Sequence, residues 1–312
     1  MNIATIIMRK TSILFCVFFV ISVSIQAQTF LPVWEKENMP NSKGGVVRDS
    51  IVNEIAYKIG TPGMYVFQPS RMANEGAAVL ILPGGGYGHI AYQIGGFQFA
   101  KWLNSLGVTA FVLTYRLPQS ADVDTCYKAP LQDAQRALRY IRGNAEKWGI
   151  KANKIGVMGS SAGGHLSACL STFKEDWSGV DDSLDSVSFT PDFAILVSPV
   201  ILMDESGHKS SRENLLGEYH SPQRAYLFSC DKRVTPQTPP TFLAHALDDR
   251  TVSCLNSLVY FKALKENNVK GSTLHIFPKG GHALNLRRNP GTANQWSDLV
   301  EKWLKEIGVI KP

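Results

Sequence analysis

Ser161 stands at the centre of a pentapeptide whose pattern can build a catalytic nucleophile. Residues 159–163 read Gly-Ser-Ser-Ala-Gly, which is G-x-S-x-G, and they follow a short apolar run and precede an expected helix. In that context the glycines permit a sharp turn that exposes the central hydroxyl at a helix N-terminus. The alternatives are an ordinary glycine-rich turn and Ser160 as the reactive hydroxyl. The central position of the motif favours Ser161.

A serine nucleophile needs a base, and His282 is the histidine best placed to serve. In an elbow of this type the acid and then the histidine follow the nucleophile along the chain. His282 ends the segment Lys-Gly-Gly-His after the last apolar run, on an expected loop. The other six histidines lie too early, in a polar segment or within apolar runs, where a core role is more usual: His89, His165, His208, His220, His245 and His275.

Asp248 and Asp249 are both candidates for the acid that orients the base. They directly follow the apolar run 241–247, at the carboxyl end of an expected strand. A carboxylate there would accept the ring N–H of His282, fix its tautomer and stabilise the imidazolium. The expected place of the acid favours Asp249. Asp248 is then expected to cap the loop.

The segment Pro-Gly-Gly-Gly-Tyr at residues 83–87 follows an earlier apolar run. Enzymes with a G-x-S-x-G nucleophile place part of the oxyanion hole in a loop at this point of the chain. Glycine lets backbone N–H groups approach a substrate oxygen closely. We expect the N–H groups of Gly85, Gly86 and Ala162 to hold the oxyanion. A phosphate loop would need a Gly-Lys-Ser/Thr ending, which is absent, and the match to a dinucleotide fingerprint is loose. The triad supplies all the proton transfers, so the sequence implies no cofactor and no metal.

Apolar runs alternate with helical patterns from residue 77 to the C-terminus. Strands are expected at 77–82, 108–115, 154–158, 193–197, 241–247 and 273–277. Helices are expected at 97–106, 131–148, 255–268 and 293–307, and from the end of the 159–163 motif to about residue 173. This alternation predicts an α/β fold with a mostly parallel central sheet and helices on both faces. Residues 203–240 are expected to form an excursion or partial cap, and residues 28–60 an arm and an edge hairpin. Residues 28–312 are expected to be one domain.

The composition predicts a chain that folds around a hydrophobic core and does not bind nucleic acid. The 312 residues are 44% hydrophobic and 19% charged, which excludes an intrinsically disordered chain. The net charge is +6, but acidic and basic residues are interspersed and no run of five basic residues occurs. A mildly basic surface is therefore expected, with no nucleic-acid partner.

The first 27 residues have the pattern of a secretory signal peptide. Arg9 and Lys10 precede an uncharged apolar run from Ile13 to Ile25, and the small residue Ala27 precedes the expected cut. A membrane anchor is the alternative, but the apolar run is short for a span. We expect cleavage, no stable membrane span afterwards, and a secreted or periplasmic protein. The four remaining cysteines, at 126, 169, 230 and 254, fit no zinc pattern, and the sequence does not choose a pairing among them.

Together these motifs resemble the α/β-hydrolase superfamily, and within it the secreted acetylxylan-esterase-like and feruloyl-esterase-like carbohydrate esterases. These are related to the hormone-sensitive-lipase group and the catalytic domain of prolyl oligopeptidases. The matching stretches occur in the family's order over much of residues 77–286: LILPGGGYGHIAYQIGGFQFAKWLNSLGVTAFVLTYRLP, APLQDAQRALRYIRGNAEKWGI, KIGVMGSSAGGHLSA, PPTFLAHALDD and LHIFPKGGHALNL. In such relatives the acid commonly stands in Asp-x-x-Val, which implies Asp249 here.

The resemblance implies a serine esterase that removes acyl groups, most simply acetyl, from plant-polysaccharide sugars such as those of xylan. Tyr87, Tyr92, Trp34 and Trp177 are aromatic residues on which a sugar could stack, although such residues more often pack in the core. Three places depart from the family pattern. Ser160 stands where the family often has an aromatic residue, and Gly95-Gly96 stands where an acidic residue is often found. The segment after the acid lacks the family's common proline pattern.

Two other functions fit the same fold. A prolyl-oligopeptidase-type peptidase would need an additional large domain, which the roughly 50 residues before the first clear strand cannot build. A binding protein without activity would require neither the triad residues nor the glycine loop. Ester hydrolysis is therefore the favoured function.

Overall fold

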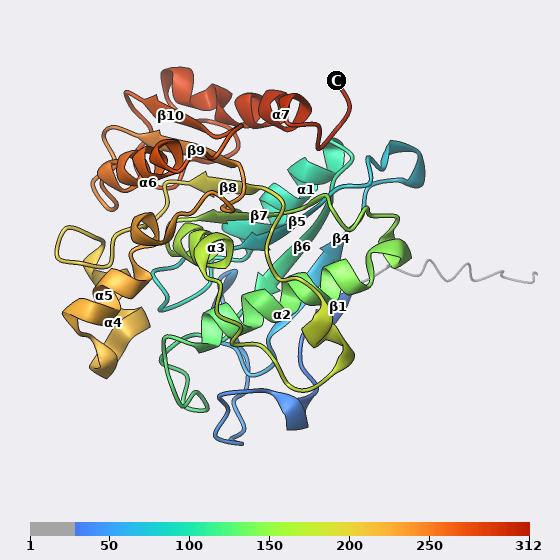
Figure 1. Ribbon diagram of the computed structural model, residues 1–312, viewed down its shortest axis with the longest axis vertical. Coiled ribbons are helices and arrows are strands. Elements are labelled where there is room, and N and C mark those ends of the chain that lie inside the picture. The colour runs from blue at the N-terminus through green and yellow to red at the C-terminus, as the bar shows by residue number, and fades with distance from the viewer. Residues whose placement is uncertain (1–28) are drawn as a thin grey trace, which may run out of the picture.

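The computed structural model describes residues 29–312, which form a central eight-stranded sheet between two layers of helices (Figure 1). Six neighbouring strands are parallel, and β4 runs antiparallel to both β6 and β1. The expected mostly parallel α/β sheet is confirmed. In spatial order the strands are β1 (Phe30–Pro32), β4 (Gly63–Phe67), β6 (Thr109–Thr114), β5 (Ala78–Leu82), β7 (Ile155–Ser160), β8 (Ala194–Val197), β9 (Thr241–Ala246) and β10 (Thr273–Phe277).

Apolar side chains of the central strands point alternately into two separate cores. On β5, Leu80 and Leu82 contribute to one core, and Val79 and Ile81 contribute to the other. A strand that is buried on both faces is a continuous apolar run, which is why the sequence revealed these strands. The first core is covered by α2 (Ala129–Gly143), α3 (Ala162–Thr172) and α6 (Leu255–Glu266), and the second by α1 (Gln98–Ser105) and α7 (Trp296–Glu306).

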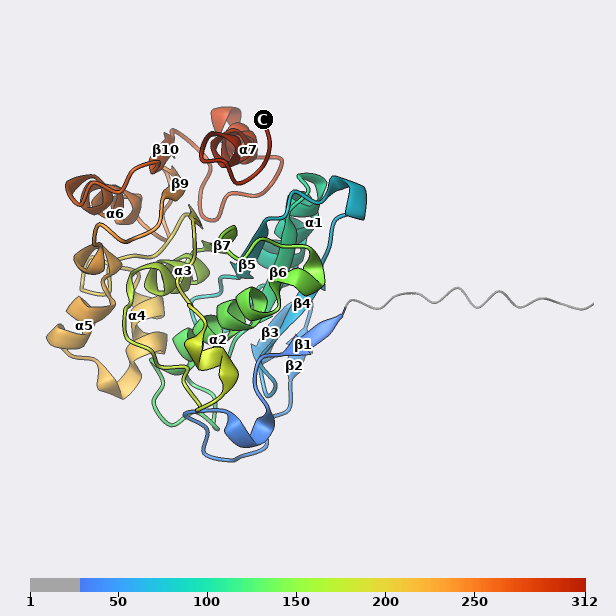
Figure 2. The same ribbon diagram turned by 45° about the vertical axis from the view of Figure 1, so that its right-hand side comes forward.

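The N-terminal segment differs from expectation in one respect. The expected hairpin is present as β2 (Ser50–Val52) and β3 (Ile55–Lys58), but it forms a separate two-stranded sheet (Figure 2). It does not occupy the edge of the main sheet, because β1 lies there, paired with β4.

The polar segment 203–240 contains two short helices, α4 (Lys209–Leu216) and α5 (Pro222–Phe228), which lie together at one side of the molecule (Figure 2). Leu215, Leu216, Ala225 and Phe228 are buried in the first core, so the segment is packed against the domain. The other six positions of α4 are polar, and α5 is only seven residues long, which is why the sequence showed no clear helical pattern there.

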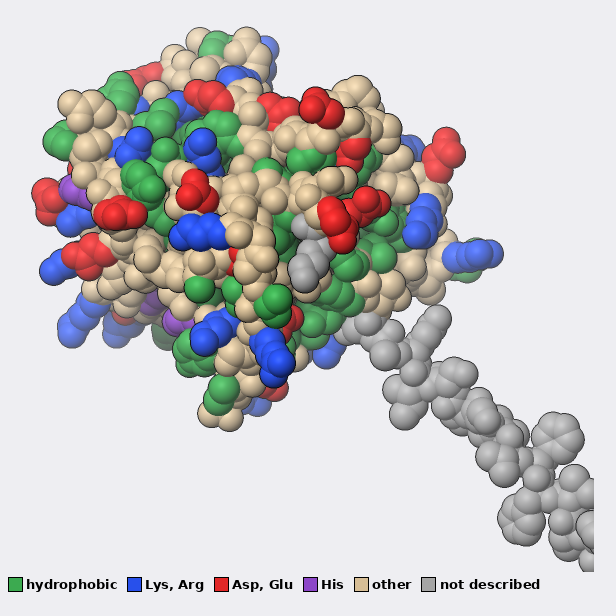
Figure 3. Space-filling model, turned by 90° about the horizontal axis from the view of Figure 1, so that it is seen from below, with side chains coloured by type: hydrophobic (Ala, Val, Ile, Leu, Met, Phe, Trp, Pro, Cys, Tyr) green, Lys and Arg blue, Asp and Glu red, His purple; other side chains and the backbone are tan. Residues whose placement is uncertain are grey.

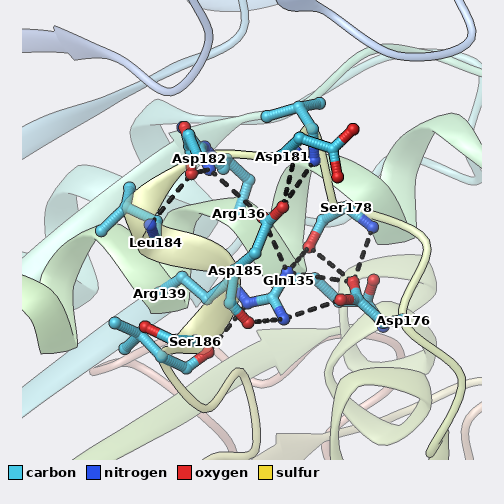
Figure 4. A network of polar contacts seen from close by, with 12 residues as sticks. Gln135, Arg136, Arg139, Asp176, Ser178, Asp181, Asp182, Leu184, Asp185 and Ser186 are labelled. Atoms are coloured by element: carbon cyan, nitrogen blue, oxygen red, sulfur yellow. Dashed lines mark hydrogen bonds and ion pairs between the residues drawn. The ribbon is translucent and has the colours of Figure 1, made fainter.

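A network of ion pairs fastens the loop after α3 to α2 (Figure 4). Arg139 on α2 contacts Asp176 through two nitrogen–oxygen pairs of 3.0 and 2.7 Å, and its guanidinium also donates to Ser178 and to the Asp185 carbonyl. Arg136, one helical turn away, forms a two-pronged pair with Asp182. These arginines are mostly buried, so the paired geometry compensates the charges that folding removes from water.

Acidic and basic side chains are interspersed on the face shown in Figure 3, in keeping with the mixed charge pattern of the sequence. Among residues 29–312, no helix has both the length and the apolar character needed to cross a membrane. The predicted signal peptide, residues 1–27, lies outside the described residues.

Candidate active site

The three candidate catalytic residues and the glycine loop all follow the carboxyl ends of parallel strands. Ser161 follows β7, Asp249 follows β9 and His282 follows β10, while the glycine loop follows β5. Carboxyl ends of parallel strands meet at one edge of a sheet, which is where ligands of open α/β sheets bind. The topology therefore brings together residues that are 121 positions apart in sequence.

Ser161 has a strained backbone, with φ of 55° and ψ of −124°, between the end of β7 and the start of α3. The turn brings backbone atoms close to Gly159 and Gly163, where only glycine leaves enough room. A Cβ on Gly159 would lie 2.2 Å from the carbonyl oxygen of Gly163, and a Cβ on Gly163 would lie 2.0 Å from that of Leu82. Both positions of the G-x-S-x-G motif therefore require glycine. The surrounding contacts hold this strained conformation, and Ser161 lines a cavity.

A chain of hydrogen bonds connects the hydroxyl, the imidazole and a carboxylate. The Nε2 atom of His282 lies 2.9 Å from Ser161 Oγ, and its Nδ1 atom lies 2.8 Å from Asp249 Oδ2. With Nδ1–H donating to the carboxylate, Nε2 is left to accept the serine proton. The Asp249 side chain is fully buried, whereas the His282 side chain is 23% exposed, so the base faces the cavity. This arrangement can activate a hydroxyl as a nucleophile.

The Asp249 carboxylate is surrounded by donors. Its Oδ1 atom accepts the N–H groups of Thr251 and Val252, each at 2.9 Å, and its Oδ2 atom accepts from His282. Burial alone would raise the pKa of Asp249, but hydrogen bonds from His245, His282 and the Val252 N–H outweigh burial and hold that pKa well below its usual range. The group is therefore a carboxylate whenever the protein is near neutral pH.

His245 is a member of this network that sequence reasoning assigned to the core. It is fully buried on β9, and its Nε2 atom lies 3.2 Å from Asp249 Oδ2 and 2.9 Å from the Val252 carbonyl oxygen. Its Nδ1 atom accepts from Ser257 Oγ at 2.8 Å. Both ring nitrogens are thus satisfied, as expected for a core histidine, but one partner is the acid itself. The four-residue spacing between His245 and Asp249 is the signal that could have suggested this contact.

The carbonyl groups of the glycine loop accept hydrogen bonds from the protein, whereas the N–H groups of Gly85 and Gly86 are left without a partner in the part of the chain that the structure describes. The carbonyl of Gly84 accepts the Ala91 N–H, and that of Gly85 accepts the N–H groups of residues 88 and 89. The Gly86 carbonyl accepts from Asn214 Nδ2 at 2.8 Å, a contact from α4 that the sequence did not suggest. Within residues 29–312, neither Gly85 nor Gly86 uses its N–H in a backbone or side-chain hydrogen bond.

Glycine is required at Gly85, and the first helical residue adds a further donor. Gly85 has φ of +141°, and a Cβ there would lie 2.0 Å from the carbonyl oxygen of His89. Ala162 is the first residue of α3, and the first N–H groups of a helix have no partner inside it. The loop and the helix start can therefore offer three N–H groups to a developing negative charge.

Ser161 and His282 open into a cavity of about 440 Å³, a size that suits a small ligand. Its wall has an apolar part, which includes Ile94, Phe99 and Leu284, and a polar part from several loops and the start of α4. The polar residues include His208, Ser210, Asn214 and Asn285. Two of the unusual sequence positions, Ser160 and Gly95, also line the cavity.

His208 is a cavity residue that remains uncharged near neutral pH. Burial lowers its pKa, and the neighbouring His282 lowers it further. Its Nδ1 atom lies 2.8 Å from Ser211 Oγ at the start of α4. A neutral imidazole can donate or accept a hydrogen bond to a neutral ligand, so this residue suits an uncharged polar substrate.

The sequence predicts that Tyr87 and Tyr92 bind substrate, but the structure places neither ring in the cavity around Ser161. Tyr87 is fully buried, and its hydroxyl lies 2.7 Å from His165 Nδ1, while Tyr92 is buried against Tyr65 and Phe97. Tyr87 lines a separate, neighbouring cavity together with Gly88, and the Tyr92 ring packs against other aromatic rings. Trp34 and Trp177 also lie away from the cavity around Ser161.

Within residues 29–312, His165, Cys169 and Cys230 form the one cluster whose ligand atoms approach one another as a metal site would require, all within 4.8 Å. Both ring nitrogens of His165 are already occupied, one by the Tyr87 hydroxyl at 2.7 Å and the other by the Phe228 carbonyl at 2.8 Å. A metal would have to break one of these buried hydrogen bonds. We therefore interpret the cluster as packing beneath the glycine loop.

Comparison with known proteins adds a family to this geometry. A model of the BD-FAE family matches residues 64–264. The chain is 34% identical over 261 residues to an acetylxylan esterase of Xylanibacter ruminicola, with 81% of this chain and 50% of that protein covered. It is also 34% identical to endo-1,4-beta-xylanase B of Butyrivibrio fibrisolvens, with 81% and 40% covered. The chain thus spans half or less of the length of these curated relatives.

Two solved structures share the fold. The acetyl ester-xyloside bifunctional hydrolase of Caldicellulosiruptor lactoaceticus superposes with a TM-score of 0.79 and 34% identity, and the alignment covers 93% of this chain and all of that one. Esterase 2 of Thermogutta terrifontis, with propionate bound, has a TM-score of 0.68 at 24% identity, covering 88% of this chain and 97% of that one. The α/β-hydrolase fold expected from the resemblance is confirmed.

Proposed function

Because the chain belongs to the BD-FAE family, we propose that it is a serine carboxylic-ester hydrolase that removes acetyl groups from the sugars of xylan. The observation that carries this proposal is the hydrogen-bonded series Ser161, His282 and Asp249 beside a glycine loop with free N–H groups. The relatives named above include an acetylxylan esterase and an acetyl ester-xyloside hydrolase, which supports the acetyl group and the xylan sugar.

In the first half of the proposed reaction, Ser161 Oγ attacks the ester carbonyl carbon while His282 Nε2 takes the hydroxyl proton. The carbonyl oxygen becomes an oxyanion that the N–H groups of Gly85, Gly86 and Ala162 stabilise. Loss of one such donor costs about 3–4 kcal/mol in the transition state. His282 then gives its proton to the sugar oxygen as the ester bond breaks, which releases the sugar hydroxyl and leaves an acyl-serine.

In the second half, water replaces the sugar. His282 takes a proton from the water while the water oxygen attacks the acyl carbon. The same N–H groups stabilise the second oxyanion. The proton returns to Ser161 Oγ as the acyl–oxygen bond breaks and the carboxylic acid leaves. Throughout, Asp249 stays ionised and stabilises the imidazolium.

The cavity suits an ester with a small acyl group and a polar alcohol. The apolar wall at Ile94, Phe99 and Leu284 can contact the acyl methyl, and the polar wall at His208 and Asn214 can hydrogen-bond sugar hydroxyls. We propose a polysaccharide or oligosaccharide ester as the substrate. The N-terminal pattern Arg-Lys followed by an uncharged apolar run supports export to the periplasm or the medium, where such polymers are found.

Acetate release from acetylated xylan tests the proposal, with 4-nitrophenyl acetate assayed in parallel for wild type and Ser161→Ala. We expect wild type to hydrolyse both substrates and the variant to hydrolyse neither above a residual rate. Hydrolysis of the small ester alone would keep the mechanism and overturn the xylan substrate. Equal activity of the variant and wild type would overturn Ser161 as the nucleophile.

A further inference from the structure

A second cavity, of about 480 Å³, adjoins the one that contains Ser161. Both cavities are lined by Gly88, which is exposed. Because Gly88 is a glycine, it places no side chain between them. His89 lines the first cavity, and the centroid of its ring lies 5.7 Å from that of Tyr57, which lines the second. The two cavities are therefore neighbours along one surface.

A second contact links residues that line the two cavities. Gln119 lines the second cavity, and its Nε2 atom donates to the Asn214 carbonyl at 2.8 Å. Asn214 lines the first cavity and in turn donates to Gly86 of the glycine loop. A ligand that extends past Gly88 would thus enter a cavity lined by Tyr57 and Gln119.

The wall that carries Tyr57 is fixed to the glycine loop. The neighbouring residue, Ala56 on β3, exchanges two backbone hydrogen bonds with Ile90, of 3.0 and 2.8 Å. These bonds attach the β2–β3 hairpin to the loop that follows the oxyanion glycines. The hairpin therefore presents Tyr57 at a fixed position relative to Ser161, although it is not part of the main sheet.

The residues around the second cavity suit a carbohydrate. Tyr57 is 47% exposed, and an exposed tyrosine offers an apolar face to a sugar ring. Arg48, Lys58 and Gln119 line the same cavity and carry hydrogen-bond donors that sugar hydroxyls accept. The apolar wall of the first cavity, at Ile94, Phe99 and Leu284, offers no such side-chain donors.

We propose that the second cavity is a subsite for the xylan units adjacent to the acylated sugar, with Tyr57 stacking on one of them. This inference rests on the proposed function, because it requires the acylated sugar in the first cavity. It assigns a role to the hairpin, which selects oligomeric over monomeric esters.

The test compares kcat/KM for 4-nitrophenyl acetate, an acetylated xylose and an acetylated xylotetraose. Tyr57→Ala is expected to lower kcat/KM for the tetramer about 3- to 10-fold, mainly through KM. The other two substrates should change less than about twofold, which is under 0.5 kcal/mol in the transition state. Tyr57→Phe retains the ring and should resemble wild type. Tyr226→Ala, which removes a tyrosine that is 63% exposed on α5, is the matched control and should leave all three substrates unchanged.

Two results would overturn the subsite while the proposed function stands. In one, Tyr57→Ala hydrolyses the tetramer as well as wild type does. In the other, it loses activity on all three substrates in parallel, which would mean that the hairpin only supports the glycine loop. If wild type hydrolyses 4-nitrophenyl acetate but not the tetramer, the xylan substrate and the subsite are both wrong.

Discussion

Asp248 and Asp249 are adjacent in sequence, yet their carboxylates hold different parts of the same site. Asp249 accepts from the imidazole of His282, at 2.8 Å. Asp248 accepts the backbone N–H groups of Gly280 and Gly281, at 2.8 and 2.9 Å, and so holds the loop that carries that histidine. Asp249 thus orients the imidazole ring of His282, and Asp248 positions the backbone of the loop that carries His282.

Replacing Asp249 by Asn is expected to lower kcat/KM for 4-nitrophenyl acetate about 10⁴-fold. An amide in place of the carboxylate favours the wrong tautomer of His282 and no longer stabilises the imidazolium. Steady-state kinetics at pH 7 measure the effect, and circular dichroism shows whether the fold is retained. A folded Asn variant with nearly wild-type activity would mean that Asp249 is not the acid.

Replacing Asp248 by Ala is expected to have a smaller and different effect. Two N–H groups of the loop lose their acceptor, which should destabilise the loop by about 1–3 kcal/mol and lower activity by about tenfold. Asp248→Asn keeps an acceptor oxygen and should lose less. Kinetics and thermal unfolding of both variants check this order. A loss as large as that of Asp249→Asn would exchange the roles of the two residues.

The depressed pKa of Asp249 predicts how its contribution to stability changes with pH. The folded pKa lies below the unfolded value of about 3.9, so the contribution is fully present above that pH and is lost as pH falls towards the folded pKa. The difference in unfolding free energy between wild type and Asp249→Asn should therefore be larger at pH 7 than at pH 3. Urea unfolding at both pH values measures it. A difference that is constant or grows on acidification would contradict the assigned pKa direction.

His245 is expected to act on catalysis through Asp249. His245→Gln should lower kcat for 4-nitrophenyl acetate by about tenfold with little change in KM, because the carboxylate loses a donor that fixes its orientation. His275→Gln is the matched control, since His275 lies on β10 with Thr273 Oγ1 as its hydrogen-bond partner. Equal kcat for wild type and His245→Gln would limit His245 to packing.

Removal of divalent metals should leave activity unchanged. Both nitrogens of His165 are engaged by protein groups, so the His165, Cys169 and Cys230 cluster has no free imidazole ligand. Dialysis against a chelator, followed by assay with 4-nitrophenyl acetate, tests this. A loss of activity that zinc restores would show that the cluster binds metal.

The sequence predicted the parts of the fold that follow from local pattern. Strands such as β5 and β7 are apolar runs buried on both faces, and the glycines around Ser161 are required by close backbone contacts, so both left a signal in the residues. Strand β4 was not expected. It is short, and only its pairing with β6 and β1 makes it part of the sheet.

Contacts between distant residues explain what the sequence could not predict. Nothing near Asn214 indicates that its amide reaches Gly86, which is 128 residues away. Tyr87 and Tyr92 follow the glycine loop closely in sequence, but packing turns both rings into the interior. The exposed ring at the second cavity, Tyr57, lies on a hairpin that two hydrogen bonds attach to Ile90.

Covalent labelling with an organophosphate such as paraoxon tests the central claim, that Ser161 is the activated nucleophile, most directly. The reagent phosphorylates an activated serine, and mass spectrometry of the digested protein locates the added group. We expect the label on Ser161 in wild type and in Ser160→Ala, with hydrolysis of 4-nitrophenyl acetate lost in parallel, and no label in Ser161→Ala. A label on Ser160, or an inactivated protein with Ser161 unmodified, would contradict the account.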